Sequence, residues 1–320
     1  MLISVLAILL GLVLLTYGAD RFVIGAASVG RFLGLSPMIV GLTIVAFATS
    51  APEMLVAGVA AWDGATGLAI GNAVGSNITN IALVLGATAA IAPLSVHSKT
   101  IRREFPMMFV VLIVTFALLL DGDLSRLDGS ILLLGLLLLI ASTVYLGKKS
   151  RPDDPILEEF EEELEEGLTP MMAFFWLMLG SLLLLAGSRV LVNGAVDIAR
   201  FLGVSDLIIG LTIVAVGTSL PELAASLMSA MKNEQDMALG NILGSNMFNM
   251  LGVLSVPGLI HPAPVAQDVM VRDFPIMFFL SALMFFMSYG FHEGGTITRI
   301  NGIILLSCFA AYELLLYFTG

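Results

Sequence analysis

Residues 41–53 read GLTIVAFATSAPE, and residues 210–222 read GLTIVAVGTSLPE. Of these 13 aligned positions 10 are identical, which two unrelated apolar helices would not share by chance. A second polar stretch follows each copy, GNAVGSNITN at 71–80 and GNILGSNMFN at 240–249. Adding 169 to a residue number in the first copy gives its partner in the second. The sequence therefore indicates an internal duplication, with a functional site where the two copies meet.

The composition is that of a chain buried in a lipid bilayer. Of its 320 residues 58% are hydrophobic and 12% are charged, about half the charged fraction of a soluble domain. Apolar runs of about 20 residues recur along the chain, whereas a membrane β-barrel would show segments of about ten residues with alternating polarity. The single cysteine, Cys308, excludes a disulfide within the chain. The sequence predicts an all-α polytopic membrane protein.

Ten transmembrane helices are expected, five in each half of the chain. The apolar segments lie at approximately 2–32, 37–62, 68–93, 105–120, 127–146, 169–201, 205–231, 237–260, 274–289 and 298–318. We expect a first five-helix repeat at 1–147 with its motif at 41–80, an acidic linker at 148–168, and a second five-helix repeat at 169–320 with its motif at 210–249. Because five is an odd number, the second repeat enters the membrane from the opposite side, which gives inverted-topology repeats.

Basic residues predict the orientation in the cell membrane. With the amino terminus outside, nine Lys and Arg residues fall in inner loops and three in outer loops, while Arg21 and Arg189 lie within spans. The positive-inside rule therefore favours N-out and C-out, with the linker at 148–168 in the cytoplasm. The inner set is Arg31, Lys99, Arg102, Arg103, Lys148, Lys149, Arg151, Lys232 and Arg299, and the outer set is Arg126, Arg200 and Arg272.

The net charge of −11 comes largely from the linker. Nine carboxylates lie between Asp153 and Glu166, and without them 16 acidic residues stand against 14 basic ones. We interpret this run as a solvated loop. The acidity gives no indication of a nucleic-acid partner, and the expected partners are the bilayer and the transported ions.

The chemistry of the duplicated motif centres on one glutamate in each copy. A carboxylate in the middle of a membrane helix costs roughly 2.5–3.5 kcal/mol on insertion scales, and neither motif contains a Lys or Arg to neutralise Glu53 or Glu222. The partner is then a bound cation or a proton. A single such glutamate can simply hydrogen-bond to the backbone, but two at duplicated positions favour ion binding.

Hard oxygen donors surround each glutamate in the sequence. Thr49 and Ser50 precede Glu53, and Ser76 and Asn80 lie four residues apart on one helix face. Hydroxyl, carboxylate and carboxamide oxygens suit Ca²⁺ and Na⁺. Zinc is disfavoured, because the three histidines are in expected loops and the one cysteine is in the last apolar run.

The backbone is expected to contribute as well. Pro52 and Pro221 remove a helical hydrogen bond, so carbonyls of the preceding turns, around 46–49 and 215–218, lose their partners. Such carbonyls at membrane depth coordinate cations where they line a polar cavity.

Asn77 and Asn246, offset from the Ser/Asn stripe, are expected to hydrogen-bond between helices. Asn72 and Asn241 lie one further turn back on that stripe. Close helix packing is expected at Gly71, Gly75, Gly86, Gly240, Gly244 and Gly252.

Other charged groups within the spans are interpreted as structural. Asp20, Asp197 and Glu313 are expected to pair with Arg21, Arg189 or interfacial water.

The two motifs resemble the alpha-repeats of the sodium/calcium exchanger family, within the calcium/cation antiporter superfamily. The residues that carry the resemblance are 41–53 with 71–80 and 210–222 with 240–249. It covers nearly the whole chain, and the length is similar to that of prokaryotic members with ten transmembrane helices and no large regulatory domain. The resemblance implies antiport of Ca²⁺ against Na⁺ by alternating access, in which the first and sixth helices slide across the rest, with no cofactor.

The resemblance also implies a set of ligands, with Glu53 and Glu222 at the centre. Ala48 and Ala51 depart mildly from the usual glycine and leucine of the family. Asn249 is neutral where potassium-dependent relatives carry Asp, which disfavours K⁺ co-transport and favours competition between Ca²⁺ and Na⁺. The implied ligands are Glu53, Glu222, the side chains of Thr49, Thr218, Ser50, Ser219, Ser76, Ser245, Asn80 and Asn249, and the carbonyls of Ala46 and Ala215.

Three alternatives remain open from the residues themselves. In the first, Ca²⁺ or another cation is exchanged for H⁺, since both glutamates are able to take up protons. An intramembrane hydrolase is disfavoured, because no nucleophile–base pair accompanies the carboxylates. A channel is disfavoured because inverted halves around one closed site fit alternating access better. We expect a secondary transporter rather than an enzyme. The sequence does not give the oligomeric state, and a monomer is compatible with it.

Overall fold

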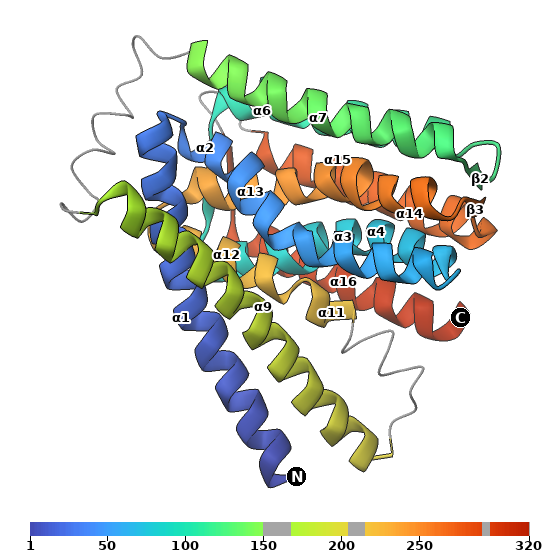
Figure 1. Cartoon of the computed structure of the whole chain (residues 1–320), viewed down its shortest axis with the longest axis horizontal. Coiled ribbons are helices and arrows are strands. Elements are labelled where there is room, and N and C mark those ends of the chain that lie inside the picture. Colours follow the sequence, from blue (N-terminus) through green and yellow to red (C-terminus); the bar gives the residue numbers. More distant parts are fainter. Residues whose placement is uncertain (150–167, 204–214, 290–294, 320) are drawn as a thin grey trace.

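The computed structural model describes residues 1–149, 168–203, 215–289 and 295–319, which form a bundle of long helices (Figure 1). The first half contains α1 (Leu2–Leu33), α2 (Pro37–Val40), the π-helical η1 (Gly41–Val45), α3 (Ala46–Trp62), α4 (Thr66–Thr79), η2 (Asn80–Leu85), α5 (Gly86–Ile91), β1 (Leu94–Val96), α6 (Ser98–Leu118), β2 (Asp123–Leu124) and α7 (Arg126–Lys149).

The second half repeats this order. It contains α9 (Pro170–Phe201), α11 (Ala215–Thr218), α12 (Leu220–Met231), α13 (Gln235–Phe248), η4 (Asn249–Val253), α14 (Ser255–Ile260), β3 (Ala263–Pro264), η5 (Val269–Asp273), α15 (Phe274–Ser288), β4 (Gly295–Ile297) and α16 (Arg299–Thr319).

The helices confirm the predicted all-α membrane architecture. Among the described residues, 8 helices are long and apolar enough to cross a membrane. The fourth predicted span corresponds to α6, which begins at Ser98, seven residues before the apolar run at 105. The seventh predicted span and the acidic linker lie partly or wholly outside the described residues, and α7 extends to Lys149, into the predicted linker. Charged residues continue both helices because the backbone hydrogen bonds do not require apolar side chains.

The helices α1 and α9 pack side by side along their length, at an angle to the other helices (Figure 1). Small residues permit this close approach, as is usual between membrane helices. A Cβ on Gly187 would lie 2.8 Å from the backbone nitrogen of Leu15 and 3.0 Å from the carbonyl of Gly11. These two helices are the first of their respective repeats, so they are equivalent helices under the pseudo-twofold symmetry of the chain.

The centre of the other group is α13. All of its residues from Met237 to Phe248 are buried. It contacts α2, η1 and α3 of the first repeat as well as α12 of the second. The two motifs therefore meet at α13, where the duplication predicted a site.

Two short antiparallel ribbons join the repeats. In one, β1 pairs with β4, with Leu94 opposite Ile297, and in the other, β2 pairs with β3, with Leu124 opposite Ala263. They lie at opposite ends of α6, which is long enough to span a bilayer. These strands were not predicted from the sequence. Two or three residues are too few to show a periodic pattern, and their pairing joins segments far apart in the chain.

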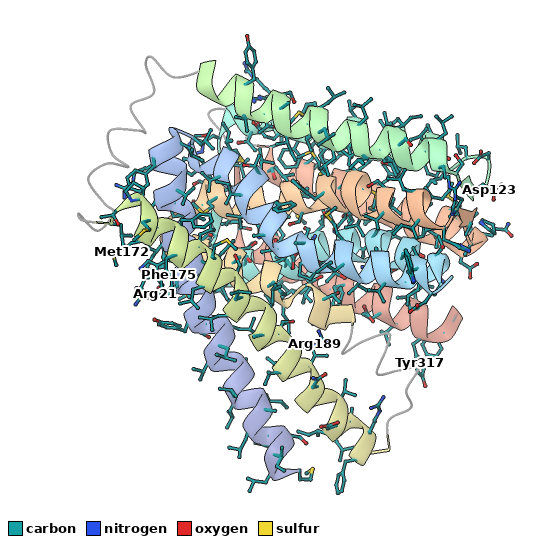
Figure 2. The ribbon with its side chains drawn as sticks, viewed as in Figure 1. Arg21, Asp123, Met172, Phe175, Arg189 and Tyr317 are labelled. Carbon is teal, nitrogen blue, oxygen red and sulfur yellow. The ribbon has the colours of Figure 1, made fainter. Side chains whose placement is uncertain are left out.

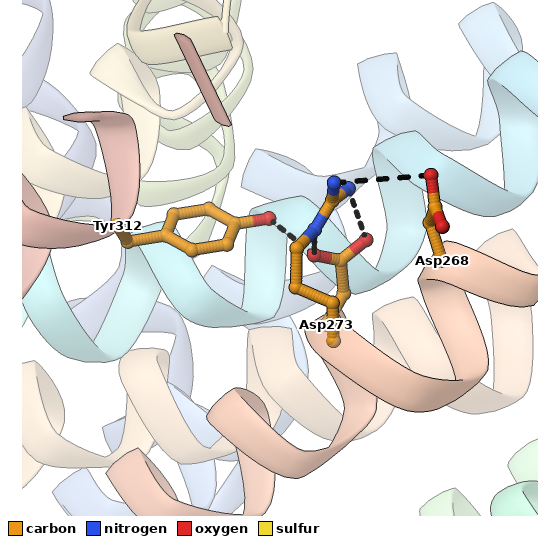
Figure 3. Close-up of polar contacts among 4 residues, drawn as sticks. Asp268, Asp273 and Tyr312 are labelled. Carbon is orange, nitrogen blue, oxygen red and sulfur yellow. Dashed lines mark hydrogen bonds and ion pairs between the residues drawn. The ribbon is translucent and has the colours of Figure 1, made fainter. Parts of the chain in front are cut away.

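A partly buried polar cluster links η5 to α16, and its residues lie outside the duplicated motifs in the sequence (Figure 3). The Asp273 carboxylate accepts hydrogen bonds from Arg272, at 2.8 and 3.1 Å, and from the Tyr312 hydroxyl, at 3.2 Å. Asp268 lies 4.0 Å from Arg272. The stretch RDFP at 272–275 corresponds to REFP at 103–106 in the first repeat. Because each buried carboxylate has a cationic neighbour in sequence, we interpret this second duplicated pattern as structural.

Candidate cation-binding site

Glu53 and Glu222 come from equivalent helices of the two repeats and lie deep in the bundle. Glu53 is on α3 and Glu222 is on α12, and their exposed fractions are 2% and 1%. The hydroxyl of Ser50 in the first repeat donates to Oε1 of Glu222 in the second, at 3.5 Å. The fold therefore brings together the motifs that the duplication placed 169 residues apart.

One oxygen of each glutamate has no protein partner. Oε2 of Glu53 and Oε2 of Glu222 are buried without a hydrogen bond. Among the ion pairs of the described residues, none involves either carboxylate. A buried charge is ordinarily paired or bound to a metal. The two orphaned oxygens therefore point to an ion or a proton as the missing partner.

The backbone around the two glutamates is not the same in both copies. In the first copy α3 continues through Pro52 to Trp62. In the second, α11 ends at Thr218, Ser219 has φ −92 and ψ 5, and α12 begins at Leu220 with Pro221 in its first turn. Glu222 thus lies at a helix N-terminus, where the helix dipole favours a negative charge. The expected disturbance by proline takes the form of a helix break in the second copy only.

Thr49 connects the first repeat to α13. Its hydroxyl donates to Oδ1 of Asn241 at 3.3 Å and lies 3.5 Å from the hydroxyl of Ser245. The same oxygen is 3.4 Å from the carbonyl of Ala46. Three members of the predicted ligand set, Thr49, Ala46 and Ser245, are therefore adjacent.

The Ser/Asn stripes occupy equivalent places on the third and eighth spans. Ser76 on α4 and Ser245 on α13 are buried, and Asn80 and Asn249 begin the π-helical segments η2 and η4. Single π-helical turns are frequent at functional sites. Both amide atoms of Asn80, Oδ1 of Asn249 and the hydroxyl of Ser219 are buried without a hydrogen bond. Unsatisfied oxygens of this kind are what a bound cation would satisfy.

Two further members of the predicted set belong to the second copy of the first motif. Thr218 ends α11 and lines a cavity together with Glu53. Ala215 begins α11, and its carbonyl belongs to the turn before the helix break.

Two residues outside the predicted ligand set complete the network. The Nδ2 atom of Asn241 donates to the hydroxyl of Ser226 at 2.8 Å and to the carbonyl of Glu222 at 3.4 Å. Its Oδ1 accepts from Ser245 at 3.4 Å. The sequence placed Asn241 on the polar stripe without assigning it a role, and it did not single out Ser226. The sequence feature that could have pointed to Ser226 is a difference between the two copies, since the equivalent residue in the first copy is Ala57.

Asn241→Ala is expected to weaken Ca²⁺ binding about tenfold. The change removes the amide that holds Thr49, Ser226 and Ser245 in place, and it leaves buried hydroxyls without partners at roughly 1–3 kcal/mol each. Equilibrium ⁴⁵Ca²⁺ binding to the purified protein measures the effect. The matched control is Asn72→Ala, the equivalent position in the first repeat, which is half-buried and has an Nδ2 without a described partner. Equal losses of Ca²⁺ affinity in the two variants would contradict the prediction that Asn241 has a role that its equivalent, Asn72, lacks.

A second pair of equivalent asparagines joins the repeats directly. Nδ2 of Asn77 donates to the carbonyl of Asn246 at 3.1 Å, and Sδ of Met277 lies 3.4 Å from the same nitrogen. The expected hydrogen bond between these helices is confirmed. Because the two residues are 169 positions apart, the bond lies close to the pseudo-twofold axis.

Four of the six glycines predicted to permit close packing do so. A Cβ on Gly240 would lie 2.6 Å from the carbonyl of Met38, and one on Gly244 would lie 2.7 Å from Cβ of Ala46. Gly86 and Gly252 also have neighbours at 3.1–3.2 Å. At Gly71 and Gly75 no described atom lies within 4 Å. The second and eighth spans are thus in close backbone contact at Gly240 and Gly244.

A cavity of about 640 Å³ reaches the site beside the middle of α9. Its walls include Glu53, Thr218 and both prolines of the duplicated motifs. The hydroxyls of Thr49 and Ser50, by contrast, are buried among protein atoms. The structure therefore opens the site toward one face of the bundle. The remaining lining residues are Leu55, Val56, Leu182, Leu185, Ala186, Ser188, Arg189, Val192, Asn193 and Gly217.

Comparison with known proteins decides the family. The family model described as "Sodium/calcium exchanger protein" matches residues 3–145 and 172–318, one match in each repeat. The chain belongs to the sodium/calcium exchanger family. Membership confirms the resemblance of the two motifs. It also explains why the exchanger has one such motif in each half.

Relatives of known sequence and structure extend over nearly the full length of this exchanger. The putative antiporter CaxA of Alkalimonas amylolytica is 49% identical over 317 residues, covering 99% of each chain. The sodium/calcium exchanger MaX1 of Methanosarcina acetivorans is 30% identical over 352 residues, again covering 99% of each. A solved structure of the sodium-calcium exchanger NCX_Mj superposes with a TM-score of 0.83 at 33% identity, covering 98% of this chain and 99% of the other. The ten-helix fold with two inverted repeats is therefore established.

Proposed function

We propose that this exchanger moves Ca²⁺ in one direction and Na⁺ in the other through a single site at Glu53 and Glu222. The observation that carries the proposal is the pair of buried carboxylates, each with one oxygen lacking a protein partner. Two negative charges match one Ca²⁺, and the surrounding neutral oxygens supply the further ligands that Ca²⁺ needs, about 6–8 in all. The twelve predicted ligands form the proposed ion sites.

Coupling to Na⁺ is favoured over coupling to H⁺ by the neutral oxygens. A proton needs only a carboxylate, whereas Na⁺ needs several oxygen ligands. The unsatisfied amide oxygens of Asn80 and Asn249 and the hydroxyl of Ser219 serve a metal cation and have no role in proton binding. With two formal negative charges at the site, Ca²⁺ and several Na⁺ ions compete rather than bind together. Exchange for H⁺ at the same two glutamates is the second candidate.

We further propose that both termini face the outside and that the linker at 148–168 lies in the cytoplasm. The excess of basic residues in the loops on the linker side supports this orientation. In this orientation the second span runs outward, and the cavity that reaches Glu53 is the path from the outside, since Leu55 and Val56, which follow Glu53 along that span, line it. Structures of NCX_Mj are described as showing extracellular ion exchange, and their likeness to this chain supports the same direction.

The coupling ion is tested by ⁴⁵Ca²⁺ uptake into proteoliposomes. Vesicles loaded with Na⁺ and diluted into Na⁺-free buffer are expected to accumulate Ca²⁺. Vesicles loaded with choline at the same pH are the control, and they are expected to show no accumulation, because choline is too large for the ion sites. A third set carries a pH gradient without Na⁺.

Each outcome assigns the coupling. Uptake only with internal Na⁺ supports the proposal. Uptake driven by the pH gradient and indifferent to Na⁺ would replace it with H⁺ exchange at the same site. No Ca²⁺ movement under either gradient would mean that the site carries another cation.

A further inference from the structure

The access cavity has a positive charge on its wall. Arg189 lies on α9 beside α11 and lines the cavity together with Glu53 and Thr218 (Figure 2). It is exposed, and it lies 19 residues into a helix that spans the membrane. An exposed arginine at that depth is costly in lipid and is ordinarily found facing a water-filled cavity. The cavity is therefore where the guanidinium of Arg189 is solvated, on the route to the carboxylates.

The equivalent hollow of the first repeat does not reach either glutamate, and it has an acidic residue at the position equivalent to Arg189. A hollow of about 540 Å³ along α1 is lined by Val13, Thr16 and Asp20, which correspond to Leu182, Leu185 and Arg189. Neither glutamate lines it. The hollow is completed by Leu12, Tyr17, Arg21 and Met228.

Asp20 forms ion pairs beside this hollow. Its carboxylate lies 2.8 Å from Nζ of Lys232, at the end of α12, and 3.5 Å from Nε of Arg21. The expected pairing of Asp20 with Arg21 is confirmed, and Lys232 is an additional partner. The two halves, which duplicate the ligands, thus reverse the sign of the charge at this one position of the access path.

We propose that the positive charge of Arg189 weakens cation binding at the site reached through this cavity, and that it weakens Ca²⁺ binding more strongly than Na⁺ binding. The inference rests on the proposed function in one respect, namely that cations reach Glu53 through this cavity. The electrostatic energy of an ion is proportional to its charge, so the factor for Ca²⁺ is the square of the factor for each Na⁺. For a fixed charge roughly 8 Å away in water, Coulomb's law gives roughly a 2.4-fold effect on Na⁺ and roughly a sixfold effect on Ca²⁺.

The expectation that the factor for Ca²⁺ is the square of the factor for Na⁺ distinguishes an electrostatic role of Arg189 from a structural one. A change in packing at α9 would alter the two apparent affinities by unrelated factors, or by the same factor. An electrostatic effect also shrinks as salt is raised, because the screening length falls from roughly 10 Å at 0.1 M to roughly 3 Å at 1 M. Lysine in place of arginine keeps the charge and is expected to keep the wild-type behaviour.

The test uses four forms of the full chain, the wild type, Arg189→Gln, Arg189→Lys and Arg200→Gln. Arg200 lies on the same helix eleven residues further on, roughly 16 Å away, and does not line the cavity. Equilibrium ⁴⁵Ca²⁺ binding to the purified protein, with Na⁺ as competitor and choline chloride to hold ionic strength, gives both affinities without requiring transport. Na⁺-driven ⁴⁵Ca²⁺ uptake is measured on the same preparations.

Arg189→Gln is expected to tighten Ca²⁺ binding roughly sixfold and Na⁺ binding roughly 2.4-fold, with both gains reduced at 1 M salt. Arg189→Lys and Arg200→Gln are expected to match the wild type. Unchanged affinities in Arg189→Gln, equal factors for both ions, or the same gain in Arg200→Gln would overturn the inference. If the charge-dependent shift is present but the wild type shows no Na⁺-driven uptake, the inference stands and the proposed function fails. If uptake is present without the shift, only the inference fails.

Discussion

Glu53→Gln is expected to lower the affinity for Ca²⁺ at least about 100-fold and to abolish ⁴⁵Ca²⁺ uptake, and Glu222→Gln is expected to do the same. Each glutamate supplies half of the formal charge of the site and has an oxygen with no protein partner. Truncating one member of a buried charge pair costs about 2–5 kcal/mol. Glutamine has nearly the same shape, so the loss reports charge rather than packing.

Thermal unfolding separates loss of binding from loss of the fold. A ligand that binds only the native state raises its stability by mass action. Ca²⁺ is therefore expected to raise the melting temperature of the wild type and to leave that of Glu53→Gln unchanged. Without Ca²⁺ the variant is expected to be at least as stable as the wild type, since an unpaired buried carboxylate has been removed.

The matched control is Glu313→Gln, which removes another glutamate within a span. Glu313 lies on α16, outside the duplicated motifs, and has a buried Oε2 without a partner. Wild-type binding and uptake are expected in this variant. Wild-type Ca²⁺ uptake in Glu53→Gln would exclude Glu53 as a ligand. Loss of uptake in all three variants would indicate a general requirement for intramembrane carboxylates instead of a two-glutamate site.

Gly240→Ala is expected to inactivate the exchanger and to lower its thermal stability. A Cβ at this position would lie 2.6 Å from the carbonyl of Met38, 3.0 Å from the nitrogen of Leu42 and 3.1 Å from Cα of Gly41. All three atoms belong to backbone, so no side chain can rotate out of the way. The second and eighth spans must separate, and a shift of that kind costs roughly 1–3 kcal/mol or more.

Separation of these two spans also disrupts the site. Thr49 is on the second span and its partners Asn241 and Ser245 are on the eighth. The control is Gly67→Ala on α4, where nothing described lies within 4 Å of a built Cβ. Alanine there is expected to be neutral or to stabilise the helix by up to about 1 kcal/mol. Melting temperature and ⁴⁵Ca²⁺ binding are measured for both variants, and a Gly240→Ala protein with wild-type values would contradict the close backbone contact.

The duplicated motif made the fold predictable. Ten apolar segments divided into two sets of five require inverted repeats, whatever the packing. The helix ends differ from the predicted spans by a few residues. In α6, charged residues extend the helix back to Ser98, before the apolar run begins. The paired strands β1 with β4 and β2 with β3 were not predictable, because their stability comes from partners in the other repeat.

The residues that gather at the candidate site were predictable from the sequence, but the asymmetry of the site was not. The high cost of a carboxylate in a membrane helix singled out Glu53 and Glu222 from the sequence. Asn241 was not given a role, because its importance comes from contacts with Thr49 on one side and Ser226 on the other. Only one of these partners has an equivalent in the other copy, since Ala57 replaces Ser226.

The sequence by itself determined the number of spans, their inverted relation and the chemistry of the oxygen-rich motifs. It could not show beside which of the two repeats a cavity reaches the candidate site, since both repeats carry nearly the same motif. Only the tertiary structure shows this. It breaks the helix at Ser219 but not at the first copy, and it places Arg189 on an open cavity and Asp20 in an ion pair with Lys232. The physical reason is that equivalent residues can occupy different environments once α1 and α9 pack against the other helices in one of two possible arrangements.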